Sequence, residues 1–138
     1  MRTVEEPMAL GDALAQHSDP KTLVVVDCLT LWLTNLLMPH DAVEQQAGNA
    51  ENSLDQQSNR PLAHVLPAQA AMLLIAMKKA AGPVVLVGNE IGLGVIPMGR
   101  ETRAFVDALG RLNQDVAAIC ERVTFMAAGL PLTLKGTA

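Results

Sequence analysis

Acidic and amide side chains follow two short apolar runs of this 138-residue sequence. Asp27 comes directly after Leu23–Val26, and Asn89 and Glu90 follow Val84–Val87 after a single glycine. In an open parallel sheet, ligands bind outside the carboxyl ends of the strands. A carboxylate at the end of a buried strand is typical of enzymes that hold Mg²⁺ beside nucleotide phosphates, directly or through water. The pattern therefore favours a nucleotide site in which Asp27 binds magnesium.

The same stretch of sequence also has a purely structural interpretation. An aspartate after a strand commonly caps the next helix, because its side chain accepts a hydrogen bond from a first-turn N–H group. Thr30 and Thr34, just beyond it, are typical of threonines that bond their own helix backbone. The sequence pattern alone leaves both interpretations of Asp27 open.

A glycine-punctuated loop, Gly88–Gly99, contains the second pair of polar residues. It lacks the G-x-G-x-x-G spacing of a dinucleotide site, so a flexible connection between strand and helix is one interpretation. Arg100 and Arg103 open the helix predicted after it. A phosphate at that helix start would meet backbone N–H groups and guanidinium donors, and solvated surface charge is the alternative for either arginine.

Apolar periodicity predicts the elements that would position these residues. Helices are predicted over Met8–Gln16, Leu29–Leu37, Ala68–Ala81 and from Phe105 to about residue 120, and strands over Leu23–Val26, Val84–Val87, Val123–Ala127 and Leu132–Leu134. The first two strands are continuously apolar, which is typical of parallel strands covered on both faces. The last two predict a hairpin. This order of elements predicts an α/β fold.

Length and composition fit one α/β domain over residues 1–138, with half of the residues hydrophobic. A polar stretch at about residues 40–61 predicts a surface insertion. The net charge of −4 provides no basic surface for a polynucleotide, so nucleic acid is not an expected partner. The longest uncharged apolar stretch, Leu62–Met77, falls short of the roughly 20 residues of a membrane span. Two cysteines without C-x-x-C spacing and an N-terminus unlike a signal peptide predict a cytoplasmic protein.

Three stretches of the chain resemble a known enzyme family. They are VVVDCLTLWLTNLL, VGNEIGLGVIPMGRETRAFVDALGRLNQDVAA and VTFMAAGLPLTLKG. The most specific part is N-E-x-G-x-G-x-x-P-x-x-R-x-x-R-x-F at Asn89–Phe105, followed by G-R-x-N-Q at Gly110–Gln114. The chain is similar to the bifunctional adenosylcobinamide kinase/adenosylcobinamide-phosphate guanylyltransferases of cobalamin biosynthesis, over nearly its whole length except the polar insertion.

The resemblance implies a P-loop NTPase fold of the RecA-like kind, a three-layer sandwich with a mostly parallel sheet, assembled as a homotrimer. It implies phosphorylation of adenosylcobinamide by ATP or GTP with Mg²⁺. It then implies GMP transfer from GTP to adenosylcobinamide phosphate, through a guanylylated histidine, to give adenosylcobinamide-GDP. Asp27 matches the family's acidic residue that is expected to bind Mg²⁺ and nucleotide. Glu5 of R-T-V-E matches a family glutamate that contacts guanine nucleotide. Asn89, Glu90, Arg100 and Arg103 are further candidates for nucleotide binding.

Two family elements have no counterpart in these 138 residues. They are an N-terminal strand with its G-x-x-x-x-G-K-S loop and the guanylylated histidine, which lies ahead of the R-T-x-E stretch. The histidines of this chain show no mutual ligand spacing and take no catalytic role; they are His17, His40 and His64. We therefore expect a sheet without the P-loop strand, with unpaired strand edges.

The expected consequence is that this chain transfers neither phosphate nor GMP. The leading interpretation is a family enzyme without its N-terminal part. The alternative is a noncatalytic remnant that binds nucleotide weakly or associates with a full-length copy. An unrelated α/β binding domain is a third interpretation, under which the match at Asn89–Gln114 would be accidental.

Overall fold

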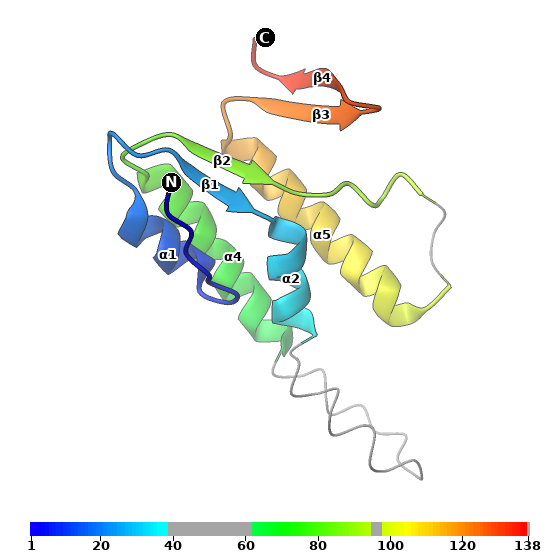
Figure 1. Ribbon diagram of the computed structural model, residues 1–138. Coiled ribbons are helices and arrows are strands. Elements are labelled where there is room, and N and C mark those ends of the chain that lie inside the picture. The colour runs from blue at the N-terminus through cyan, green and yellow to red at the C-terminus, as the bar shows by residue number, and fades with distance from the viewer. Residues whose placement is uncertain (39–61, 95–97, 138) are drawn as a thin grey trace. The chain divides into compact units, whose positions relative to one another are not determined.

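The computed structural model describes residues 1–38, 62–94 and 98–137 (Figure 1). Two compact units divide the chain, Met1–Asn89 and Glu90–Ala138. The polar insertion predicted at about residues 40–61 lies outside the described residues, and the single domain predicted over residues 1–138 stays a prediction.

The first unit contains a pair of parallel strands. β1 (Val24–Asp27) pairs with β2 (Val84–Val87) in a register that sets Asp27 opposite Val87. Valine, a β-branched residue that suits an extended backbone, occupies six of the eight positions of these strands. This pairing confirms the predicted α/β class with parallel strands, and it brings the carboxyl ends of β1 and β2 to one edge.

Within residues 1–38 and 62–89, three helices accompany these strands: α1 (Leu10–His17), α2 (Leu29–Leu37) and α4 (Leu62–Lys79). Helices α1 and α4 lie side by side (Figure 1). They approach closely at Gly11, where a Cβ atom would lie 2.8 Å from the carbonyl carbon of Met72. The buried apolar side chains of this unit are Leu14, Val26, Leu29, Trp32, Leu33, Leu36, Leu73 and Ala76.

Helix α4 begins earlier than the sequence predicted. Pro67 was expected in the first turn of a helix over Ala68–Ala81, but it lies inside a helix that starts at Leu62. A proline here removes one backbone N–H donor near the start of the helix, where the apolar residues beyond it still favour continued helix. The helix ends at Lys79, just before the Gly82-Pro83 pair that the sequence marked as its end.

One face of the β1–β2 pair is exposed, so the prediction of strands covered on both faces is wrong for this structure. Val25 and Val85, neighbours in the register, are 57% and 47% exposed, whereas Val26 is 8% exposed. Successive side chains of a strand point to opposite faces. A continuous apolar run therefore permits burial on both faces but does not require it.

The second unit contains one long helix and a hairpin. Helix α5 (Arg100–Ile119) buries Leu109, Leu112 and Val116 along one stripe. β3 (Val123–Ala127) and β4 (Leu130–Lys135) pair antiparallel, which confirms the predicted hairpin. The turn places Ala128 and Gly129 at positive φ, 52° and 77°, as a two-residue hairpin turn requires.

Lys135, the last residue of β4, ties the hairpin to the end of α5. Its Nζ donates hydrogen bonds to the carbonyl oxygens of Ala117 at 2.9 Å and Ala118 at 3.0 Å. The last carbonyl groups of a helix have no partner within the helix and carry partial negative charge, so a cation there is favourable. This contact fixes β4 against α5 within the second unit.

The strands of the described residues form two separate sheets of two strands each. The single, mostly parallel sheet predicted from the family resemblance is therefore not seen in the described ranges. β3 and β4 pair with each other because their short turn favours antiparallel neighbours, and each strand has one hydrogen-bonded neighbour.

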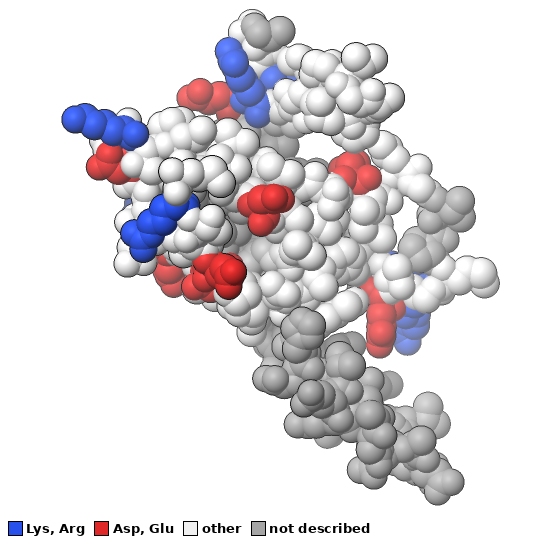
Figure 2. All heavy atoms as spheres, in the orientation of Figure 1, with Lys and Arg blue, Asp and Glu red and all other residues white. Residues whose placement is uncertain are grey.

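Charged side chains are scattered over the face seen in Figure 2, where Lys and Arg lie singly among uncharged atoms and near acidic residues. None of the helices in residues 1–38, 62–94 and 98–137 has the length and hydropathy that a membrane-spanning helix needs.

Candidate functional site

Asp27 is exposed at the carboxyl end of β1, on the same edge of the sheet as the residues that follow β2. Asn89 lies two residues beyond Val87, the end of β2. Its backbone N–H and its side-chain Nδ2 both donate to Thr30 Oγ1, at 3.0 and 3.2 Å. The threonine hydroxyl thus joins the start of α2 to the segment that leaves β2. We refer to Asp27, Thr30 and Asn89 as the carboxyl-edge site.

Cys28, and not Asp27, is the N-cap residue of α2. Its Sγ accepts a hydrogen bond from Leu31 N–H at 3.4 Å. The interpretation of Asp27 as the helix cap is therefore wrong, because the cap position is one residue later. Asp27 lies at the end of β1, and its side chain is exposed to solvent.

The two threonines of α2 have different partners. Thr34 Oγ1 donates to the carbonyl oxygen of Thr30 at 2.9 Å, which confirms the predicted bond to its own helix backbone. Thr30 was predicted to do the same, but its hydroxyl accepts from Asn89 instead. The reason lies in the tertiary structure, because Asn89, two residues beyond the end of β2, reaches the first turn of α2.

The segment before α1 is attached to α2, the helix that follows Asp27. Trp32 Nε1 donates to the carbonyl oxygen of Met8 at 2.9 Å, and Asn35 Nδ2 donates to that of Pro7 at 3.4 Å. Glu5, the predicted contact for guanine nucleotide, is exposed two residues before this attachment. The structure therefore holds the Glu5 segment on α2 through contacts that local sequence patterns did not predict.

Glu6, next to Glu5, has a structural role that the sequence analysis did not identify. Its Oε1 accepts hydrogen bonds from the backbone N–H groups of Ala9 at 2.7 Å and Met8 at 3.0 Å. These bonds favour the charged carboxylate and hold the pKa of Glu6 below its ordinary value. An acidic residue just before a predicted helix was the available signal.

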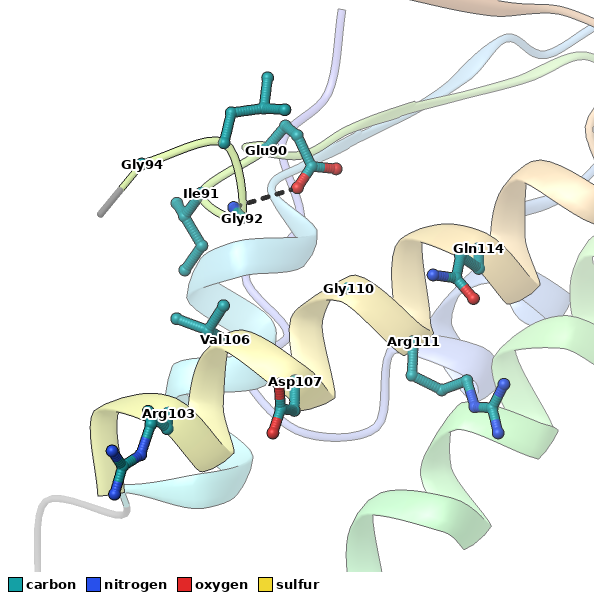
Figure 3. Close-up of a pocket in the computed structure, with 11 residues that line it drawn as sticks. Glu90, Ile91, Gly92, Gly94, Arg103, Val106, Asp107, Gly110, Arg111 and Gln114 are labelled. Atoms are coloured by element: carbon teal, nitrogen blue, oxygen red, sulfur yellow. Dashed lines mark hydrogen bonds between the residues drawn. The ribbon is translucent and has the colours of Figure 1, made fainter. Parts of the chain in front are cut away.

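In the second unit, a groove of about 630 Å³ lies between the loop Glu90–Gly94 and one face of α5 (Figure 3). It brings together two predicted site residues, Glu90 and Arg103. It adds Val106 and Asp107, and three residues of the quoted G-R-x-N-Q motif that were not named as site candidates: Gly110, Arg111 and Gln114. Arg100 is exposed at the first position of α5 and does not line the groove.

Glu90 holds the loop side of this groove in place. Its Oε1 accepts a hydrogen bond from Gly92 N–H at 3.2 Å, drawn in Figure 3, and its Oε2 accepts from Asn113 Nδ2 at 3.3 Å. In the same view Val106 points toward the loop, whereas Arg103 and Arg111 lie along the outer side of the helix. The groove therefore has a partly apolar floor and a charged rim.

The carboxyl-edge site has the donor chemistry that magnesium accepts. Mg²⁺ keeps several water molecules and is commonly held by one or two carboxylates together with substrate phosphates. A single exposed carboxylate, Asp27, fits that demand. No group of three or more His, Cys, Asp and Glu suited to a metal ion occurs within the described ranges.

The histidines were expected to take no catalytic role. His17 lies in the last turn of α1, and His40 and the side chain of His64 fall outside the described residues. Their predicted lack of a catalytic role stays a prediction.

Comparison with known proteins relates residues 1–134 to a family described as cobinamide kinase / cobinamide phosphate guanyltransferase. The bifunctional adenosylcobalamin biosynthesis protein CobP of Pseudomonas aeruginosa is 41% identical over 135 residues, which are 98% of this chain and 66% of that protein. The corresponding CobU proteins of Escherichia coli and Salmonella typhimurium are each 29% identical over 134 residues, 97% of this chain and 70% of theirs. The chain thus spans about two thirds of the length of these relatives.

Proposed function

Because this chain belongs to the cobinamide kinase / cobinamide phosphate guanyltransferase family, we propose that it acts in adenosylcobalamin biosynthesis by binding GTP or ATP at the carboxyl-edge site. The proposed reactions are those named by the family. A phosphoryl group passes from the nucleotide to adenosylcobinamide, and GMP then passes from GTP to adenosylcobinamide phosphate.

The observation that carries this proposal is the position of Asp27. Ligands of open α/β sheets bind outside the carboxyl ends of parallel strands, and the exposed Asp27 carboxylate stands there beside the Thr30–Asn89 bond. Asp27 would hold magnesium, directly or through water, and Glu5 would contact the guanine nucleotide. When bound, the metal ion would supply positive charge that offsets the charge of the phosphates.

The residues of this chain would position the substrates and would not themselves react with them. Thr30, through its bonds to Asn89, joins the start of α2 to the segment after β2, so that the backbone that carries Asp27 would be held relative to the edge. Preorganised groups of this kind cost no reorganisation when the substrate binds. Arg100 stays a candidate for phosphate contact as an exposed cation at the start of α5.

The finer features implied by the resemblance belong to the same proposal. The parallel β1–β2 pair, with α2 following β1 directly, fits part of a RecA-like P-loop NTPase sandwich. We expect a cytoplasmic homotrimer, as in the family that the sequence resembles.

The test is GTP binding to this chain with and without Mg²⁺, measured by calorimetry for the parent and for Asp27→Asn. Loss of one charge-assisted contact, about 1.5–3 kcal/mol, predicts an affinity about 10- to 100-fold lower in the presence of Mg²⁺. Asp12→Asn, an exposed aspartate of α1, is the matched control and should leave the affinity unchanged. An unaltered response to Mg²⁺ in Asp27→Asn, or no GTP binding by the parent, would contradict the proposal.

A further inference from the structure

The register of the β3–β4 hairpin shows which backbone groups point away from the hairpin. In an antiparallel pair, opposed residues alternate between those that exchange both backbone hydrogen bonds and those that exchange none. Pro131, opposite Met126, has no N–H group to exchange, so this pair is of the second kind. The alternation makes Thr124 and Thr133 the next such pair. The backbone groups of these residues therefore point outward.

The two outer edges of the hairpin differ in what they offer to another strand. On β4, Pro131 removes one outward N–H donor, and proline is a residue by which natural proteins block pairing at an exposed edge. On β3, Thr124 and Met126 both present an N–H and a C=O group, and both residues are exposed. Among the described residues, β3 has β4 as its one hydrogen-bonded neighbour. A further strand would therefore pair with the outer edge of β3, the side that faces away from β4.

The hairpin lies at the end of α5 (Figure 1) and is fixed there at its base. Lys135 binds carbonyl groups near the end of the helix, and a Cβ atom at Gly136 would lie 2.7 Å from the Glu121 carbonyl oxygen. Beyond this base, β4 is exposed along its whole length, and Leu130 and Leu132 are 70% and 56% exposed. Two strands alone are marginally stable in water, and three or more are needed where no helix packs against them. Another strand would therefore stabilise the exposed part of the hairpin.

β3 is complementary to a second β3 in antiparallel orientation. If Phe125 lies opposite Phe125 of a second copy, Thr124 of each copy lies opposite Met126 of the other. The outward N–H and C=O groups of these residues can then all pair, because Thr124 and Met126 are the residues that point away from β4. β3 has the sequence VTFMA, so no like charges meet, and the two phenyl rings lie on the same face of the new sheet.

We propose that two copies of this chain associate through the outer edges of β3, so that their hairpins form one continuous antiparallel sheet. The contact is two-fold and uses the same surface of both copies, with Thr124 of each copy against Met126 of the other. It is separate from the homotrimer expected from the family resemblance, because a two-fold contact doubles whatever assembly the other surfaces form. The association does not depend on nucleotide binding at the carboxyl-edge site.

Analytical ultracentrifugation of the 138-residue chain over a dilution series tests this proposal. Met126→Pro removes an outward N–H group of β3 and should leave the hairpin's own hydrogen bonds in place, because that group makes none to β4. Its mass should be half that of the fully associated parent. Thr133→Pro makes the same change on the outer edge of β4, so it is the matched control and should keep the mass of the parent.

Charged side chains at the two exposed positions of β3 provide a second measurement. The double variants Thr124→Lys/Met126→Lys and Thr124→Glu/Met126→Glu each place like charges opposite each other across the contact, which destabilises the pairing of strands. Each variant alone should have half the mass of the parent. An equal mixture of the two should regain the mass of the parent, because opposite charges then face each other. A general folding defect would not produce this recovery.

Amide hydrogen exchange, followed residue by residue, locates the contact. The N–H groups of Thr124 and Met126 should exchange about tenfold or more slowly when the parent is associated than after dilution, whereas that of Thr133 should not change.

Three results would overturn the proposal. One is a parent whose mass equals that of Met126→Pro at every concentration. Another is an equal loss of mass in Thr133→Pro, or no recovery of mass when the two charged variants are mixed. The third is slow exchange at Thr124 and Met126 that dilution does not change, because the outer edge of β3 would then be covered without a second copy.

Discussion

Replacing Thr30 with valine removes the hydroxyl oxygen that joins α2 to the end of β2 in the carboxyl-edge site. Thr30 Oγ1 accepts from Asn89 N–H at 3.0 Å and from Asn89 Nδ2 at 3.2 Å. Each hydrogen bond contributes roughly 0.5–1.5 kcal/mol net to stability. Asn89 is exposed, so water replaces part of what is lost. We expect Thr30→Val to lower the free energy of unfolding by about 1–2 kcal/mol.

Thr34→Val is the matched control on the same helix. Its hydroxyl donates to the Thr30 carbonyl oxygen within α2, a local bond that adds little to helix stability. The expected change in the free energy of unfolding is within about 0.5 kcal/mol.

Urea unfolding followed by the fluorescence of Trp32 is the assay. Trp32 is the single tryptophan of the chain, is 3% exposed and lies on α2, so its emission reports on the first unit. With a urea dependence of about 1–3 kcal/mol/M, the midpoint of Thr30→Val should fall by roughly 0.5–1 M. Equal destabilisation by the two substitutions would refute the bridging role of Thr30.

Two further predictions concern the first unit. Gly11→Ala should lower the free energy of unfolding by about 1–3 kcal/mol, because the new Cβ would lie 2.8 Å from Met72 backbone; a raised thermal midpoint would contradict this. Glu6 should stabilise the fold above its ordinary pKa, with that stability lost as the pH falls through its lowered folded-state pKa, because its bonds to Met8 and Ala9 need the carboxylate. Urea unfolding from neutral pH to about pH 2 should therefore show a gap between parent and Glu6→Gln that closes in acid, and parallel pH curves would count against it.

Local patterns predicted much of the secondary structure. The bounds Leu29–Leu37 for α2 and Val84–Val87 for β2 agree with the prediction, and β1 differs by one residue at each end. Apolar periodicity is a property of neighbouring residues, so it is readable without the fold. The start of α4 was missed because Pro67 suggested a boundary that the helix passes through.

The candidate sites depended on contacts that no local pattern contains. The strand ends of the carboxyl-edge site were predicted, but the partner of Thr30 lies 59 residues away in the sequence. The groove likewise needed the loop Glu90–Gly94 to meet α5, so Arg111 and Gln114 were quoted only as part of the G-R-x-N-Q motif and not as site candidates.

By itself the sequence determined the family, the α/β class and the positions of the elements, because motifs and side-chain periodicity are carried by short stretches of chain. The tertiary structure alone decided that Cys28 caps α2 and leaves Asp27 in solvent, and that one face of β1 and β2 stays exposed. It also decided that no atom of the described residues lies within 4 Å of the place where a Cβ atom of residue 110 would stand. The physical reason is that hydrogen-bond partners and burial depend on which distant residues come together, and a strand or helix can satisfy its own backbone in many such arrangements.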